Sequence, residues 1–247
     1  MTPILMELKL SRTALESFIK CPCCFYLQRR LKMKAHPMFP LTLAIATDAL
    51  LKNEFDVYRA NGTMHPLWVR HGLNVRCYVH DNLETWRSNF KGIRVVHATT
   101  GAEIFGAIDD IWQDRASGQL HIVDYKSTSK KDTPTLDGGF GDGYKRQMEI
   151  YQWLFRTAGF DVSNMGYFLY VNGRKDGGFF DQDLNGVMRF DPVLIPYQGN
   201  TDWVPQAITN AVACLHGDVI PEPTADCDSC KYFLGRSATL EAKRVPE

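Results

Sequence analysis

Hydrophobic residues recur at helical spacing in several segments of the chain. Residues 41–60 carry apolar side chains at positions 50, 51, 55 and 58, and Asn61-Gly62 is a typical helix end. The first predicted helix has Ser11 at its N-cap and contains Pro22, which should disturb it near the middle. The same spacing predicts helices at residues 11–31, 41–60, 66–91, 144–157 and 201–216. The segment after Asp218 contains Pro221 and Pro223 and is expected to form a loop.

Two short apolar runs predict an antiparallel hairpin. Residues 104–112 and 121–126 are rich in β-branched and aromatic residues, and the link between them is turn-like. Side chains alternate across a strand, so Asp124 and Lys126 should share one face while Tyr125 faces the other. Further strands are expected at residues 165–171 and within residues 179–190.

These elements predict an α/β fold with a mixed central sheet, built around the hairpin and flanked by helices on both faces. A chain of 247 residues is long enough for one substantial domain or for a domain plus a small cap, and we expect a single domain spanning residues 1–247. With 28 basic and 28 acidic residues, the chain has no net positive charge to favour tight, sequence-independent binding of nucleic acid. This balance still allows a basic groove, because acidic metal ligands lower the net charge.

The most informative chemistry lies in the hairpin. Asp109 and Asp124 could hold a divalent cation, and Lys126 follows two residues later, which is what hydrolysis of a phosphodiester needs. Asp110 is adjacent to Asp109, so only one of the two can face the metal. The alternative is that Asp124 and Lys126 form an exposed charge pair on a half-solvated sheet.

Five segments stand in a characteristic order: the L-S-R-T to C-P segment at 10–22, G-A-I-D at 106–109, V-D-Y-K at 123–126, Q-M-E-I-Y at 147–151 and the cysteine-bearing segment at 223–233. Together they resemble the RecB-like branch of the PD-(D/E)XK nuclease superfamily, which includes CRISPR-associated RecB-like exonucleases and AddB-type nucleases. The resemblance implies a restriction-endonuclease-like core and a magnesium or manganese site. It further implies that Asp109 and Asp124 are ligands, that Lys126 is catalytic, and that Gln147 and Tyr151 line the active site.

Asp48 stands where this branch usually carries a histidine, in a G-x-x-x-H pattern that here reads A-I-A-T-D. Hard cations prefer oxygen ligands, so an aspartate could replace the histidine as a metal ligand. Equally, Asp48 could be a surface residue of an amphipathic helix. Both interpretations remain open at this stage.

Four cysteines form a second constellation. Cys21 and Cys24 form one C-x2-C pair, Cys227 and Cys230 form another, and together they could join the two ends of the chain through a four-thiolate site. The resembling iron-sulfur nucleases use one cysteine at the C-P position and three near the carboxyl end, whereas this chain has Arg236 in place of the last. Either Cys24 or Cys23 supplies the fourth thiolate, for an iron-sulfur cluster or for zinc, or the cluster has been lost and these are ordinary buried thiols.

Together these observations predict a magnesium- or manganese-dependent DNase that acts on single strands or ends in repair, recombination or defence. No phosphate-binding glycine-rich loop is present, so a helicase would have to be a separate partner. The alternatives are a catalytically decayed homologue that binds nucleic acid or has a structural role, and a nuclease acting on RNA. Residues 1–7 lack the features of a signal peptide, no apolar run could span a membrane, and we expect a cytoplasmic protein with no membrane partner.

Overall fold

The computed structural model describes residues 8–33, 39 and 41–243, and the chain divides into two compact units. Unit 1 consists of Met1–Met38, Val96–Ile104 and Trp203–Glu247. Unit 2 consists of Phe39–Val95 and Phe105–Asp202. The assignment of residues 1–247 to a single nuclease domain stays a prediction.

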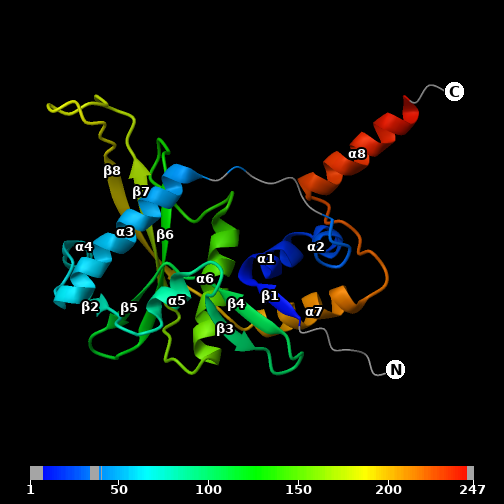
Figure 1. The fold of residues 1–247 in the computed structure, drawn as a ribbon, viewed down its shortest axis with the longest axis horizontal. Coiled ribbons are helices and arrows are strands. Elements are labelled where there is room, and N and C mark those ends of the chain that lie inside the picture. Colours follow the sequence, from blue (N-terminus) through cyan, green and yellow to red (C-terminus); the bar gives the residue numbers. More distant parts are fainter. Residues whose placement is uncertain (1–7, 34–38, 40, 244–247) are drawn as a thin grey trace. The chain divides into compact units, whose positions relative to one another are not determined.

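Unit 2 is built on a five-stranded sheet (Figure 1). Its strand order is β2-β5-β6-β7-β8, with bounds Val75–Cys77, Asp110–Asp114, Leu120–Thr128, Met165–Gly173 and Phe190–Gln198. Strands β6 and β7 are parallel, whereas every other neighbouring pair is antiparallel. The sheet is therefore mixed, and the predicted α/β fold with flanking helices is confirmed.

The predicted hairpin is formed by β5 and β6, with Asp110 opposite Val123. Asp114 closes its turn by accepting hydrogen bonds from the backbone of Ala116 and Ser117. The prediction of one continuous strand over residues 104–112 is wrong. Instead, β4 (Glu103–Gly106) belongs to a three-stranded sheet of order β1-β4-β3, with β1 at Lys9–Ser11 and β3 at Ile93–Val96. The break between β4 and β5 places Asp109 just before β5, outside the ladder.

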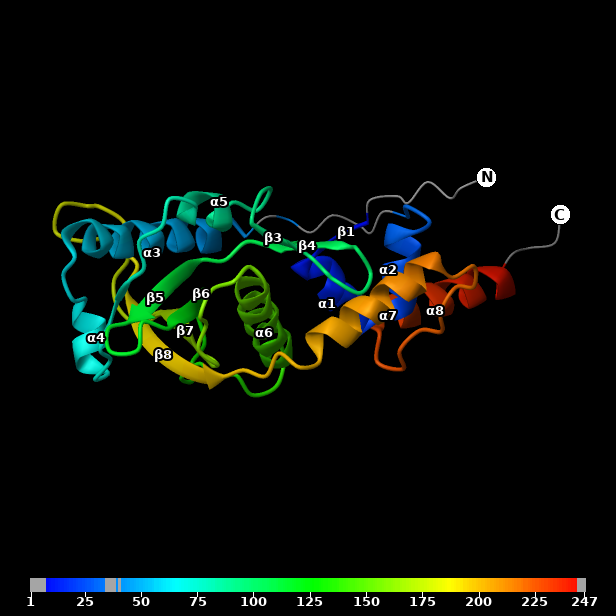
Figure 2. The same ribbon diagram turned by 90° about the horizontal axis from the view of Figure 1, so that it is seen from below.

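Two long helices flank the sheet of unit 2, α3 (Thr42–Asn61) and α6 (Gly141–Thr157) (Figure 2). Tyr125 packs in the buried cluster that contains Phe55 of α3, whereas its neighbour Asp124 contacts Gln147 of α6. Because consecutive strand residues face opposite sides, α3 and α6 cover opposite faces of β6. The sequence prediction of helices on both faces is confirmed.

Polar contacts fix helix α6 to strand β8 and to the segment just before β7. The Tyr197 hydroxyl donates to Glu149 at 2.6 Å, and the Gln152 amide donates to the Asn164 carbonyl at 2.7 Å. Gly166 lies under Met148, where a Cβ atom would come within 2.4 Å of the sulfur. These contacts set the height of α6 above β6, and so the position of Gln147.

Two regions of unit 2 differ from their predictions. Residues 66–91 are not mainly helical: they form α4 (Pro66–Arg70), strand β2 and α5 (Leu83–Arg87). Gly72, with φ of 65°, follows the end of α4 and turns the chain toward β2. The strand expected within residues 179–190 begins only at Phe190, because Asp181 accepts hydrogen bonds from the backbone of Asp183 and Asn185 and makes a turn.

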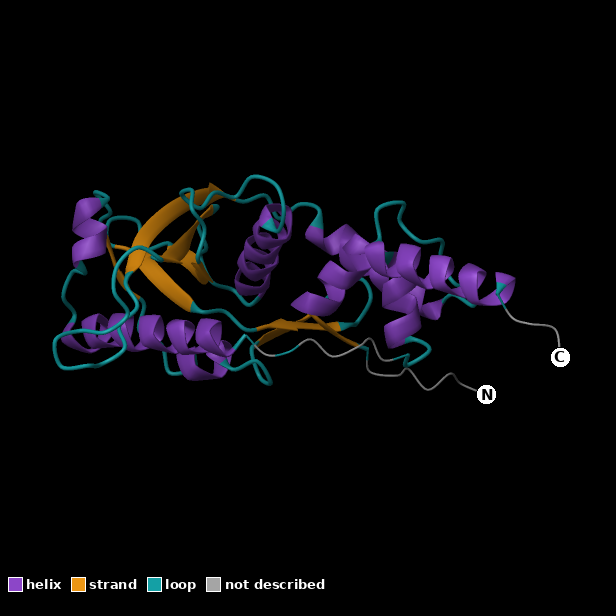
Figure 3. Ribbon diagram, turned by 90° about the horizontal axis from the view of Figure 1, so that it is seen from above, coloured by secondary structure: helices purple, strands orange, loops and turns teal. Residues whose placement is uncertain are grey.

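Unit 1 contains helices α1 (Arg12–Lys20), α2 (Pro22–Arg29), α7 (Val204–His216) and α8 (Asp228–Ala242), and Figure 3 shows that it is mostly helical. Ser11 caps α1, as predicted, by accepting from the Ala14 amide at 3.1 Å. The predicted single helix is divided at Cys21, which is extended before Pro22. The loop predicted after Asp218 is wrong from Asp228 onward, because these residues form α8, a helix whose one buried residue is Cys230. No helix among the described residues has the length and apolarity to cross a membrane.

Candidate active site and metal centre

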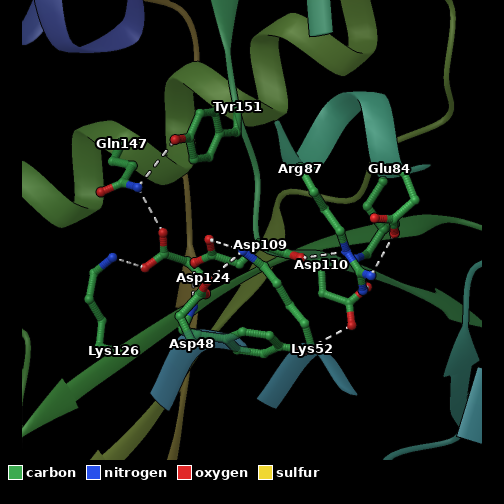
Figure 4. Close-up of polar contacts among 12 residues, drawn as sticks. Asp48, Lys52, Glu84, Arg87, Asp109, Asp110, Asp124, Lys126, Gln147 and Tyr151 are labelled. Carbon is green, nitrogen blue, oxygen red and sulfur yellow. Dashed lines mark hydrogen bonds and ion pairs between the residues drawn. The ribbon is translucent and has the colours of Figure 1, made fainter. Parts of the chain in front are cut away.

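Asp124 and Lys126 lie on the α6 side of β6 and form an ion pair (Figure 4). The Asp124 side chain is 1% exposed, and the Lys126 side chain is 15% exposed. An exposed cross-strand pair would be well solvated, so the alternative interpretation of these two residues as a surface charge pair is wrong. A carboxylate kept from water in this way requires a cationic partner or a bound metal ion.

Gln147 and Tyr151 lie one turn apart on the buried face of α6. The Gln147 amide donates to Asp124 Oδ1 at 2.8 Å and to the Tyr151 hydroxyl at 3.3 Å. The Tyr151 ring is buried, so much of it packs in the core. The structure thus brings four of the predicted site residues, Asp124, Lys126, Gln147 and Tyr151, into one connected group.

Asp109 reaches the same group from the segment before β5. Its Oδ2 accepts from the Tyr125 amide at 2.8 Å, which fixes the carboxylate beside β6. Desolvation, together with the negative charge of Asp124, raises the pKa of Asp109 to about 7. A raised pKa means that the ionised carboxylate lacks compensating positive charge, which is the condition that a cation would relieve.

Asp48 extends from α3 toward Asp109, and a lysine lies between them. Lys52 Nζ is 2.7 Å from Asp48 Oδ2 and 3.6 Å from Asp109 Oδ1. Of the two interpretations of Asp48, the structure therefore favours a site residue over a freely solvated helix face. Sequence reasoning missed Lys52. Its one available signal was the spacing of four residues from Asp48, which places both on one face of the helix.

The donor set suits a hard divalent cation. Asp48, Asp109 and Asp124 offer only carboxylate oxygens, which magnesium and manganese prefer. The carboxylate oxygens of these three residues do not all lie within 4.8 Å of one another. Within residues 8–33, 39 and 41–243, only a group of cysteines meets that distance. Lys52 and Lys126 contact the carboxylates instead. Small side-chain movements toward a common centre would be needed for three-point coordination.

Asp110 points away from this site into a buried ionic cluster. Its side chain is fully buried and accepts from Arg59, from the Tyr125 hydroxyl at 2.7 Å, and from its own neighbour's amide. Arg87 lies 3.2 Å from Asp110 and also donates from Nε to the Asp109 carbonyl at 3.0 Å. The two adjacent aspartates therefore differ in role, and the cluster of Asp110, Arg59, Arg87 and Tyr125 supports the backbone that carries Asp109.

Lys126 is held in its charged form. Desolvation lowers its pKa, but the negative charges of Asp124 and Asp109 outweigh that effect and raise it above the usual value. The ammonium also lies over the Tyr144 ring at 4.6 Å, a favourable cation–π contact. Lys126 is therefore suited to donate hydrogen bonds and to stabilise negative charge rather than to remove a proton.

The four predicted cysteines meet in unit 1. Cys24 Sγ lies 3.6 Å from Cys227 Sγ and 3.4 Å from Cys230 Sγ, and Cys21 Sγ lies 3.8 Å from Cys230 Sγ. All four sulfur atoms fall within 4.8 Å of one another, and Cys23 is not part of the group. Cys24 is thus the fourth thiol of this group, which brings α2 and the start of α8 together. Although desolvation raises the pKa of Cys21, hydrogen bonds from the backbone of Cys24 and Thr224 lower it to about 6.

Comparison with protein families agrees with this geometry. Comparison with curated proteins gave no match. The family model described as the PD-(D/E)XK nuclease superfamily matches residues 9–233, which include every site residue named above. Nucleases of this superfamily use divalent metal ions to hydrolyse phosphodiester bonds. Since the match covers most of the 247 residues, the chain belongs to the PD-(D/E)XK nuclease superfamily.

Proposed function

We propose that this protein is a magnesium- or manganese-dependent DNase that cleaves single strands or strand ends. The observation that carries the proposal is the connected group of Asp124, Lys126 and Gln147, with the Asp109 carboxylate held beside β6 by the Tyr125 amide. A decayed homologue would be expected to lose one of these groups. Their retention, with an acidic residue and a lysine both shielded from water, supports an enzyme.

Asp48, Asp109 and Asp124 would hold the cation. It would supply Lewis acidity at the phosphate and make the attacking water more acidic. Gln147 fixes the orientation of Asp124 through its amide, and Tyr151 in turn accepts from Gln147. The Lys126 ammonium orients the attacking water and stabilises the negative charge that develops on the phosphate oxygens.

The choice of DNA as substrate and the proposed biological role rest on the motifs at 106–109, 123–126 and 147–151. Their resemblance to the RecB-like branch supports DNA over RNA, and supports a role in repair, recombination or defence. It also supports action in the cytoplasm beside a helicase or another repair or defence protein. A helicase partner would supply the single strands that the proposed activity requires.

The test is cleavage of end-labelled single-stranded DNA, duplex DNA and RNA of matched sequence, each with Mg2+ or Mn2+. We expect cleavage of single-stranded DNA by the wild type and none by Asp124→Asn, which keeps the shape of the side chain but loses its charge. Cleavage of RNA alone would reassign the substrate. Titration calorimetry supplies an independent measurement: if Mn2+ gives no heat and no stabilisation, only a non-enzymatic role is left. Asp48→Asn should weaken Mn2+ binding if Asp48 is a ligand.

For the cysteine site we propose a single zinc ion. A tetrahedral site with Zn–S bonds of about 2.3 Å has sulfur atoms about 3.8 Å apart, close to the separations of 3.4–3.8 Å between Cys24, Cys21 and their partners. The iron and sulfide atoms of a cluster would stand between its thiolates and hold them farther apart. A metal would also explain how α8 is attached, because Cys230 is its one buried residue.

Metal analysis of anaerobically purified protein tests this assignment. We expect about one zinc per chain and no visible absorption. A brown chromophore would identify an iron-sulfur cluster, and absence of both would identify unliganded thiols.

A further inference from the structure

Lys52 is a charged residue of the active site to which no role has been assigned. It lies one helical turn after Asp48 on α3, and its side chain is 20% exposed. Its ammonium contacts two carboxylates that come from different elements, Asp48 on α3 and Asp109 before β5. A lysine placed only to stabilise its helix would need just the first of these contacts.

The balance of charge in the site suggests what Lys52 does. Counted as ionised, Asp48, Asp109 and Asp124 carry one negative charge more than Lys52 and Lys126 neutralise. A divalent cation would reverse this to a single positive charge, which is the complement of one phosphodiester. With Lys126 alone, the site would be neutral before the substrate arrives and would hold a phosphate less well.

The two lysines differ in their freedom to move. Lys126 is held between Asp124 and the Tyr144 ring, so its ammonium has a fixed place. Lys52 contacts the very carboxylates that a divalent cation would bind, so that cation would compete with it for Asp48 and Asp109. Lysine carries a compact charge on a flexible four-carbon stem and can exchange one oxygen partner for another.

We propose that Lys52 is a second catalytic lysine, whose ammonium exchanges Asp48 and Asp109 for a non-bridging oxygen of the scissile phosphate when the cation binds. The proposal rests on the proposed function and deepens it. In this arrangement Lys126 orients the attacking water, and Lys52 shares with it the stabilisation of negative charge on the phosphate oxygens. No proton is transferred to or from Lys52 in this role.

The test uses the full chain with Lys52→Met, which keeps much of the apolar stem and removes the charge. First, Mn2+ should bind roughly tenfold more tightly by calorimetry, because a positive charge competing for the ligands has been removed. Second, turnover at saturating Mn2+ should fall by about a hundredfold or more, the cost of losing one group that stabilises the transition state. Lys52→Arg should recover part of the turnover, since it restores a cation.

Binding of single-stranded DNA gives a readout that does not depend on cleavage. It is measured by fluorescence anisotropy with Mn2+ present, in the inactive Lys126→Met background. Adding Lys52→Met should lower the slope of log affinity against log salt by about 0.7, the value for one lost phosphate contact on a single strand. Lys20→Met is the matched control, because Lys20 forms an (i, i+4) ion pair with Glu16 in unit 1 and should leave the slope unchanged.

The possible outcomes separate the two proposals. If the wild type cleaves DNA while Lys52→Met keeps normal turnover and an unchanged salt slope, Lys52 only pairs with carboxylates and this inference is overturned. If the wild type cleaves nothing, the proposed nuclease function fails, and the salt slope still reports whether Lys52 contacts phosphate. If Lys52→Met does not fold, both measurements are made on Lys52→Gln, which removes the charge, and on Lys52→Arg, which keeps it.

Discussion

Asp110→Ala should destabilise the protein strongly, although Asp110 is not placed at the metal site. The Asp110 carboxylate is fully buried and compensates the charges of Arg59 and Arg87, whose side chains are 10% and 6% exposed. Removing one partner of a buried ion pair typically costs ~3–5 kcal/mol. Both arginines keep Asp56 as a second partner, so we expect the lower end of that range, about 3 kcal/mol.

Urea unfolding of wild type and Asp110→Ala, followed by circular dichroism, measures this difference. A loss of about 3 kcal/mol should lower the midpoint by roughly 1 M or more, given typical urea slopes of about 1–3 kcal/mol per M. Asp109→Asn is the matched control, since it changes the neighbouring residue and leaves the buried cluster in place. It should abolish cleavage without lowering the midpoint.

The reasoning would be refuted by an Asp110→Ala protein that unfolds within about 1 kcal/mol of wild type with an unchanged slope. Metal binding offers a second check, because Arg87 contacts both the Asp110 carboxylate and the backbone carbonyl of Asp109. We therefore expect Asp110→Ala to weaken Mn2+ binding as well. Asp110→Asn, which keeps the shape but not the charge, should separate the loss of charge from the loss of packing.

Three further predictions concern the two sites. Asp124→Asn and Lys126→Met should each reduce cleavage by several orders of magnitude while the circular dichroism spectrum still shows a folded protein; near-normal cleavage by either would remove it from the catalytic group. The pKa of Asp109 is raised to about 7 in the folded state and is about 3.9 when unfolded, so its contribution to stability is full below pH ~4 and is lost as pH rises through ~7. In EDTA, urea midpoints of wild type should fall across that range more than those of Asp109→Asn, and parallel curves would contradict the assignment. Cys227→Ser should lose the metal and lower the melting temperature by well over a few degrees, whereas a shift within a degree or two would show that Cys227 is not a ligand.

The sequence predicts best where a local pattern decides the structure. Helix α3 and strand β7 follow from their periodicity, and the shared face of Asp124 and Lys126 follows from alternation within one strand. The four cysteines follow from spacing and soft-ligand chemistry. In each case the information lies within a few neighbouring residues or in the residue type itself.

What the sequence could not predict depends on contacts between distant segments. Lys52 belongs to the site only because α3 crosses beside Asp109, and the burial of Asp110 requires Arg59 and Arg87 from two separate helices. Residues 66–91 were predicted as helix because Trp68 and Leu83 contribute apolar signals whose partners lie elsewhere in the fold. Helix α8 does carry apolar residues at helical spacing, but the two prolines just before it favoured a loop.

The separation of the two cysteine pairs along the chain has a consequence for the order of assembly during synthesis. Cys24 and Cys227 are 203 positions apart, and at about 5–20 residues per second the ribosome needs roughly 10–40 s to make the residues between them. For most of that interval α1 and α2 have left the ribosome, while α7 and α8 have not yet been made. All of unit 2, from Phe39 to Asp202, is made before the second pair. The nuclease core can therefore fold first, and unit 1 must wait, with its early thiols open to stray metals and oxidants, until the last ligands emerge.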